Sequence, residues 1–175
     1  MAMVGLFWIA EGDVYVGAKP SGLAPGVRLS PDGVVALGDK QSGRFPWEDV
    51  RTLTVADVPV KTLKRQVGVA TELALDTVVN MVMPTSPSRL GDAPAMLTIG
   101  VETREGDHEL SAYAAAAVGY SPAELDLSRA LLSRLTKGRQ EAATTLAAMA
   151  EWGRTWEGGS PGGTERESLL RKWVG

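Results

Sequence analysis

The side chains that could do acid–base chemistry in this sequence are few and scattered. His108 is the only histidine, and its neighbours along the chain include no recognisable partner that would orient its ring. Glu48 and Asp49 are adjacent, whereas two carboxylates that cleave a glycosidic bond must face each other across a cleft. We therefore expect His108 to be an exposed strand residue, and we predict that the protein is not an enzyme.

The residue types also give no indication of a metal or cofactor site. The chain has no cysteine, which excludes thiolate nucleophiles, disulfides and cysteine-ligated zinc, and no set of histidines and carboxylates stands at ligand spacing. The glycines of "GDVYVG" (12–17) and "EGGSPGG" (157–163) come without a phosphate-binding lysine or a strand–glycine–helix context. We expect turns and a linker there, and neither a metal nor a cofactor.

The composition and charge of the chain indicate which class of protein it belongs to. The chain has 175 residues, of which 44% are hydrophobic and 22% are charged, as in ordinary globular domains. A net charge of −3 gives no field that would recruit nucleic acid. The N-terminal stretch lacks the basic region of a signal peptide, and no run of about 18 apolar residues could span a membrane. These features predict a soluble, cytoplasmic protein that does not bind nucleic acid.

The sequence predicts short strands in the first part of the chain and again after residue 94. Period-two alternation and turn residues predict strands over 3–10, 13–18, 27–30, 34–37, 95–103 and 108–113. The stretch "RFPWEDVRTLTV" (44–55) changes period in its middle: the spacing from Trp47 to Val50 is helical, and that from Leu53 to Val55 belongs to a strand. The predicted class is α+β.

A helix should follow the last strands. Ser121 can cap it, Pro122 suits the first helical position, and Glu124 completes a capping box. Strands, then a hairpin, then a capped amphipathic helix resemble the order of a pleckstrin-homology-like (PH-like) barrel, a bent antiparallel sheet closed at one end by a helix. The stretches 26–37 and 44–55 resemble a pattern of bacterial, including actinobacterial, PH-like domains, and the resemblance covers residues 3–56 and 95–136. The resemblance implies that Trp47 ends one strand with its ring in the core.

Residues 60–83 form an insertion in this pattern. They predict a helix with a broad apolar face and a narrow polar stripe. One reading packs the apolar face on the barrel and on helix 139–156; the other leaves part of it for a second subunit, a partner protein or a membrane surface. The apolar residues assigned to such a partner are Val67, Val78, Val79 and Val82. The basic residues assigned to anionic lipid are Lys61, Lys64 and Arg65.

The C-terminal tail is a short helix behind a glycine-rich linker. Leu169, Leu170 and Trp173 lie together on it, and Thr164 with Glu167 predicts a capping box. These apolar side chains either fold back onto their own domain or dock on a partner or a neighbouring copy. Arg166 is expected to face solvent, or acids at the rim of that contact.

These patterns together predict the organisation of the chain. We expect a PH-like domain over 1–138 with the helical insertion at 60–83, an accessory helix over 139–156, a flexible linker over 157–163 and a tail helix over 164–175. The predicted function is a non-catalytic protein-interaction or scaffold module with a protein partner, a second copy of itself, or both. The alternative is a peripheral membrane or lipid-binding module, and an enzyme without a recognisable motif ranks third.

Overall fold

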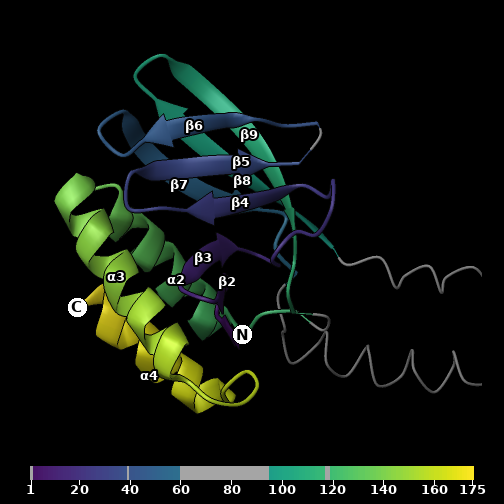
Figure 1. The fold of residues 1–175 in the computed structure, drawn as a ribbon, viewed down its shortest axis with the longest axis vertical. Helices are drawn as coiled ribbons and strands as arrows, with labels where there is room; N and C mark the ends of the chain where they lie inside the picture. The colour runs from purple at the N-terminus through teal and green to yellow at the C-terminus, as the bar shows by residue number, and fades with distance from the viewer. Residues whose placement is uncertain (1, 39, 60–94, 117–118) are drawn as a thin grey trace, which may run out of the picture.

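The computed structural model describes residues 2–38, 40–59, 95–116 and 119–175 (Figure 1). These residues form two antiparallel sheets and three helices, so the predicted α+β class is confirmed. The hydrogen-bond ladder of the described strands runs within two separate sheets and does not close into one barrel. No described helix is long and apolar enough to cross a membrane.

The first sheet is a six-stranded meander in which each strand pairs with the next along the chain. Its strands are β1 (Ala2–Val4), β2 (Phe7–Ala10), β3 (Asp13–Val16), β4 (Gly26–Leu29), β5 (Gly33–Leu37) and β6 (Gly43–Pro46). Alternate residues of the four central strands enter the core: Phe7, Ile9, Val14, Val16, Val27, Leu29, Val34 and Ala36. This is the period of two that the apolar pattern of the sequence predicts.

The expectation of one strand over 3–10 is wrong, because the chain reverses at Gly5 and Leu6 to make the β1–β2 hairpin. Gly5 has a φ of +59°, which an L side chain rarely adopts. A Cβ at Gly5 would also lie 2.2 Å from the Ser128 hydroxyl and 2.9 Å from a Leu170 methyl carbon. The glycine therefore permits both the turn and a close approach of the turn to two helices.

The second sheet contains β7 (Val50–Ala56), β8 (Met96–Thr103) and β9 (Gly106–Tyr113), in that order. The predicted hairpin over 95–113 is confirmed, with Thr103 paired to Gly106 at its turn. Gln41 joins the two sheets: its side-chain amide donates to the carbonyl oxygens of Gly26 and Ser111, and its amide oxygen accepts from the Ser111 N–H.

The corner between the two sheets lies at Trp47. Its side chain is 1% exposed and its indole N–H donates to the Ser30 carbonyl at 2.8 Å, so the core position implied by the resemblance is confirmed. The Asp49 N–H closes a tight turn on the Pro46 carbonyl at 2.9 Å. The helical spacing from Trp47 to Val50 is thus the spacing of a turn between strands, and Val50 is buried beneath it.

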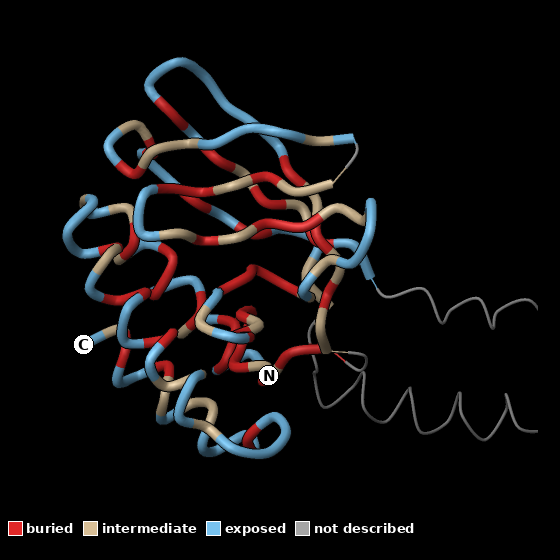
Figure 2. Tube along the Cα trace, in the orientation of Figure 1, coloured by how far each residue is buried: buried red, intermediate tan, exposed pale blue. Residues whose placement is uncertain are grey.

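Three helices stand together beside the strands (Figure 1): α2 (Pro122–Leu135), α3 (Arg139–Thr155) and α4 (Gly163–Val174). The Ser121 hydroxyl accepts from the Glu124 N–H, which confirms the predicted cap of α2. The α4 helix begins earlier than expected, with Gly162 at the N-cap and no side-chain cap from Thr164. Buried residues line the inward sides of these helices and of the strands, whereas the β8–β9 turn is exposed (Figure 2).

Candidate functional site

Several residues assigned to a partner or a lipid lie outside the described residues. They are Lys61, Lys64, Arg65, Val67, Val78, Val79 and Val82. The structure therefore does not place the apolar face of 60–83 or its basic cluster. The described part of the chain contains two other surfaces of interest, and α2 contributes to both.

The first surface holds the tail. Leu170 is 0% exposed and Trp173 is 5% exposed, and both belong to the main core cluster, with Leu169 partly buried beside them. The Trp173 ring packs edge-on against Trp152 of α3, with a centroid separation of 5.8 Å. Of the two alternatives for the tail, the structure thus shows the one in which it folds back onto its own domain.

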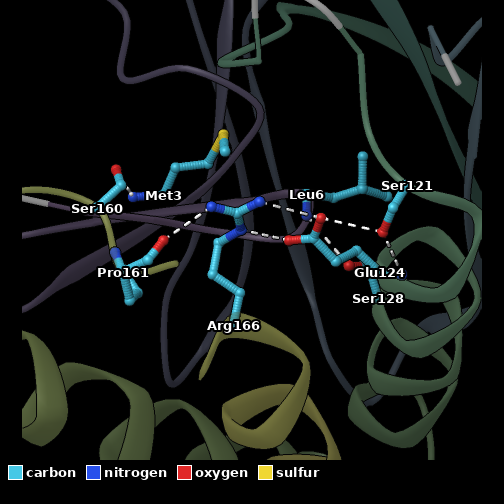
Figure 3. A network of polar contacts seen from close by, with 8 residues as sticks. All are labelled: Met3, Leu6, Ser121, Glu124, Ser128, Ser160, Pro161 and Arg166. Atoms are coloured by element: carbon cyan, nitrogen blue, oxygen red, sulfur yellow. Dashed lines mark hydrogen bonds and ion pairs between the residues drawn. The ribbon is translucent and has the colours of Figure 1, made fainter. Parts of the chain in front are cut away.

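An ion pair anchors α4 to the start of α2 (Figure 3). The Arg166 guanidinium donates through Nε to one Glu124 carboxylate oxygen and through Nη2 to the other, the second contact at 3.2 Å. Its third donor, Nη1, reaches the Pro161 carbonyl at 2.7 Å. The side chains are 16% and 4% exposed, so Arg166 meets an acid, one of its two expected surroundings, but inside the contact and not at its rim or in solvent. A fork of donors matched to two oxygens fixes the direction of approach as well as the contact.

The pKa of the Glu124 carboxyl group reflects its pairing with Arg166. Burial raises the pKa of the Glu124 carboxyl, but the hydrogen bonds and charge of Arg166, with further hydrogen bonds from Ser121, outweigh burial and lower the pKa below its usual value. The carboxylate is therefore ionised and fully engaged at neutral pH. A group in this state stabilises the docked tail and is a poor general acid or base.

The β1–β2 turn completes the place where α4 sits, which we call the tail socket: Gly5, Leu6, Glu124 and Ser128. The Leu6 N–H donates to the buried Ser128 hydroxyl at 3.1 Å. The small residue Gly5 leaves the space that the Leu170 side chain fills. Next to the socket, the Met3 N–H donates to the Ser160 hydroxyl at 2.9 Å, which ties the linker to β1.

The second surface is a groove of about 300 Å³ between β7 and α2, which we call the β7 groove. It is lined by Leu53, Thr54 and Val55 from the strand and by Arg129 and Ser133 from the helix. β7 is the first strand of its sheet, and no other described strand pairs with its outer edge. At that edge the Val55 carbonyl accepts a long hydrogen bond of 3.4 Å from Arg129 Nη2.

Arg129 is free to make stronger contacts. Its residue is exposed, and it enters no ion pair within the described part of the chain. A guanidinium has five N–H donors, and the contact of Arg129 with the Val55 carbonyl is at the outer limit of hydrogen-bond length. The β7 groove thus combines an edge that no described strand pairs, apolar walls and an available cation.

His108 and Glu48, which the sequence analysis considered for acid–base chemistry, are both exposed. His108 is exposed on β9 and its ring lies 4.7 Å, centroid to centroid, from the ring of Phe45. Glu48 is exposed and pairs with Arg139 at 3.3 Å. Within the described ranges, no three histidine, aspartate or glutamate side chains are grouped so as to hold a metal.

Sequence reasoning missed both the ion pair and the groove. The capping-box pattern identified Glu124 as an N3 residue, but nothing in the sequence connects it to Arg166, which is 42 positions away. The β7 groove depends on which strand α2 packs beside, and a local pattern carries no signal for that. Comparisons of the chain with protein-family models, with curated proteins and with solved structures found no match.

Proposed function

We propose that this chain is a non-catalytic protein-interaction module that binds an extended, acidic segment of a partner protein in the β7 groove. The observation that carries the proposal is the groove itself, where a strand edge that pairs with no other strand of the described ranges lies beside apolar side chains and an exposed arginine. An extended peptide can add to such an edge as a further strand, and its alternate side chains then enter the groove.

Arg129 supports the choice of an acidic partner. An incoming strand would offer a backbone N–H to the Val55 carbonyl and would replace the 3.4 Å contact made there by Arg129. The released guanidinium would then lie beside the bound segment, where a carboxylate can pair with it. Charge-assisted pairs of this kind are stronger than neutral hydrogen bonds and set the register of the peptide.

The scaffold that we propose is PH-like. Two antiparallel sheets joined at Trp47, followed by a capped helix that packs against β7, follow the order that the resemblance implies. The absence of cysteine fits a reducing compartment, and on that ground we place the module in the cytoplasm. Lipid binding through Lys61, Lys64 and Arg65 rests on residues outside the described ranges, so no described contact supports it.

The chemistry of the described side chains also favours binding over catalysis. Glu124, a buried carboxyl group whose pKa is lowered, is engaged by Arg166 and Ser121. A general acid or base needs a proton that it can exchange near neutral pH, and this carboxyl group does not provide one.

Peptide selection followed by groove blocking tests the proposal. A phage-displayed library of random twelve-residue peptides is panned on the wild-type chain, and the selected peptides are measured by fluorescence anisotropy. Ser133→Trp fills the groove, whereas Ala130→Trp places the same ring on an exposed position of α2 outside the lining residues.

We expect Ser133→Trp to weaken binding at least about tenfold, which corresponds to about 1.4 kcal/mol, and Ala130→Trp to leave it unchanged. The selected peptides should share an acidic position. Selection of no peptide, or equal binding by the two variants, would contradict the proposal.

A further inference from the structure

We propose that α4 is an exchangeable arm and that the tail socket also binds α4 of a second copy of this chain. Two chains would then trade their tails and form a dimer by reciprocal docking. This inference concerns the opposite side of α2 from the β7 groove and does not depend on the proposed function.

The socket is specific for a helix of one chemistry. It offers a buried carboxylate at Glu124 and a space beside Gly5, and next to it lies the ring of Trp152. The occupant supplies Arg166, Leu170 and Trp173, which follow one another at spacings of four and three and therefore share one face of the helix. A second copy presents the same face, so it matches the socket in every contact that α4 makes within one chain.

The hinge of the arm is short and exposed. Residues 157–160 are all exposed, and Gly158 has a φ of +112°, so the chain turns there through a glycine conformation. The turn is held by the Trp156 indole N–H, which donates to the Gly159 carbonyl at 2.8 Å. Ser160 also anchors this segment, since its hydroxyl accepts from the Met3 N–H.

Beyond the hinge the arm behaves as one unit. Pro161 is buried, and its carbonyl is bound by Arg166, so the start of the arm is linked to the same guanidinium that enters the socket. Opening the hinge therefore moves Pro161, Arg166, Leu170 and Trp173 together. Because the contacts in the socket are identical in the closed chain and in the exchanged dimer, hinge geometry and protein concentration decide between them.

Complementary charge reversals test exchange directly. Glu124→Arg places two arginines in the socket of one chain, and Arg166→Glu places two glutamates there, so neither variant can dock its own tail. In an equal mixture each tail meets an opposite charge in the other chain. The double variant Glu124→Arg/Arg166→Glu is the matched control, because it restores the pair within one chain.

Light scattering after size exclusion gives the readout. We expect each single variant and the double variant to be monomeric, and the mixture to form a species of twice the 18.5 kDa chain mass. A mixture that keeps the mass of its separate components would overturn the proposal. A dimer formed through residues 60–83 would appear in every sample, including the single variants, and would also overturn it.

Hinge variants of the wild-type chain keep the test decisive if a reversed charge prevents folding, as judged by circular dichroism. Deletion of Gly158 and Gly159 shortens the hinge, and insertion of four glycine and serine residues after Gly159 lengthens it. The shortened chain should become dimeric and the lengthened chain should stay monomeric. Equal masses for the two hinge variants would refute exchange.

Discussion

The tail socket and the β7 groove lie on opposite faces of the same helix, yet one is occupied and the other is open. Glu124 and Ser128 face the socket, and Arg129 and Ser133, each five positions further along, face the groove. At about 100° per residue, five positions rotate a side chain by about 140°, which explains how one helix serves two surfaces.

Two arginines show what separates these surfaces. Arg166 is largely buried and donates to three oxygens, whereas Arg129 is exposed and makes one contact, of 3.4 Å, with the described residues. A buried, fully paired charge requires an opposite charge at the same position, since its separation leaves a charge in a low-dielectric environment. An exposed charge with spare donors is the kind of group that can change partners. The comparison teaches that residue type alone does not distinguish a structural arginine from a binding one.

The largest loss of stability should follow removal of the Arg166 charge, which pairs with Glu124. Arg166→Met leaves a buried carboxylate unpaired, so the free energy of unfolding should fall by about 3–5 kcal/mol. Urea denaturation followed by tryptophan fluorescence measures the change. Arg171→Met is the control, since Arg171 is exposed and pairs with Glu167 on its own helix at 3.6 Å. A loss of less than about 1 kcal/mol for Arg166→Met would show that the socket is not organised by its ion pair.

The second-largest loss of stability should follow removal of the apolar contact that Leu170 makes in the tail socket. Leu170→Ala removes a fully buried side chain next to Gly5, and we expect a loss of about 2–5 kcal/mol in the free energy of unfolding. Leu169→Ala, at a partly buried neighbour, should cost distinctly less. Thermal melts of the two variants give the ranking. Equal melting temperatures would mean that the tail is not held in the socket in solution.

Acid should weaken the socket through Glu124. The folded-state pKa of its carboxyl lies below the ordinary value of 4.5, so the stabilisation is fully present above pH 4.5. It is lost as the pH falls through the folded-state pKa, because the unfolded chain then binds the proton more readily. In Arg166→Met burial dominates and raises the pKa of Glu124. The difference in stability between wild type and Arg166→Met should therefore shrink on acidification, and a difference independent of pH would contradict this assignment.

Substitution of Arg129 in the β7 groove should have the smallest effect on stability. Arg129→Ala should change the free energy of unfolding by no more than about 0.5 kcal/mol, since the side chain is exposed and weakly bonded. The same substitution should weaken binding of an acidic peptide selected as described above by about tenfold, as expected for the loss of a charge-assisted contact. A large loss of stability would place Arg129 with Arg166 as a structural residue and remove the contrast between the two surfaces.

Local patterns in the sequence were enough for several parts of the fold. Period-two alternation predicts the strands that bury Val14, Val16, Leu97 and Ile99, because side chains of a strand alternate between its two faces. Ser121 predicts the start of α2, because a helix N-terminus needs an acceptor for its free N–H groups. The single strand expected over 3–10 is wrong because the apolar pattern continues through the turn at Gly5, where φ is positive.

Spacing along the chain and backbone hydrogen bonding dictate the set of elements and their apolar faces, and both can be read from local sequence. The tertiary structure decided which faces meet. The match of Arg166 to Glu124, the fit of Leu170 beside Gly5 and the opening between β7 and α2 depend on contacts between residues far apart in the chain. Such contacts arise from the packing of whole elements, and no local spacing encodes which buried charge a distant arginine will reach.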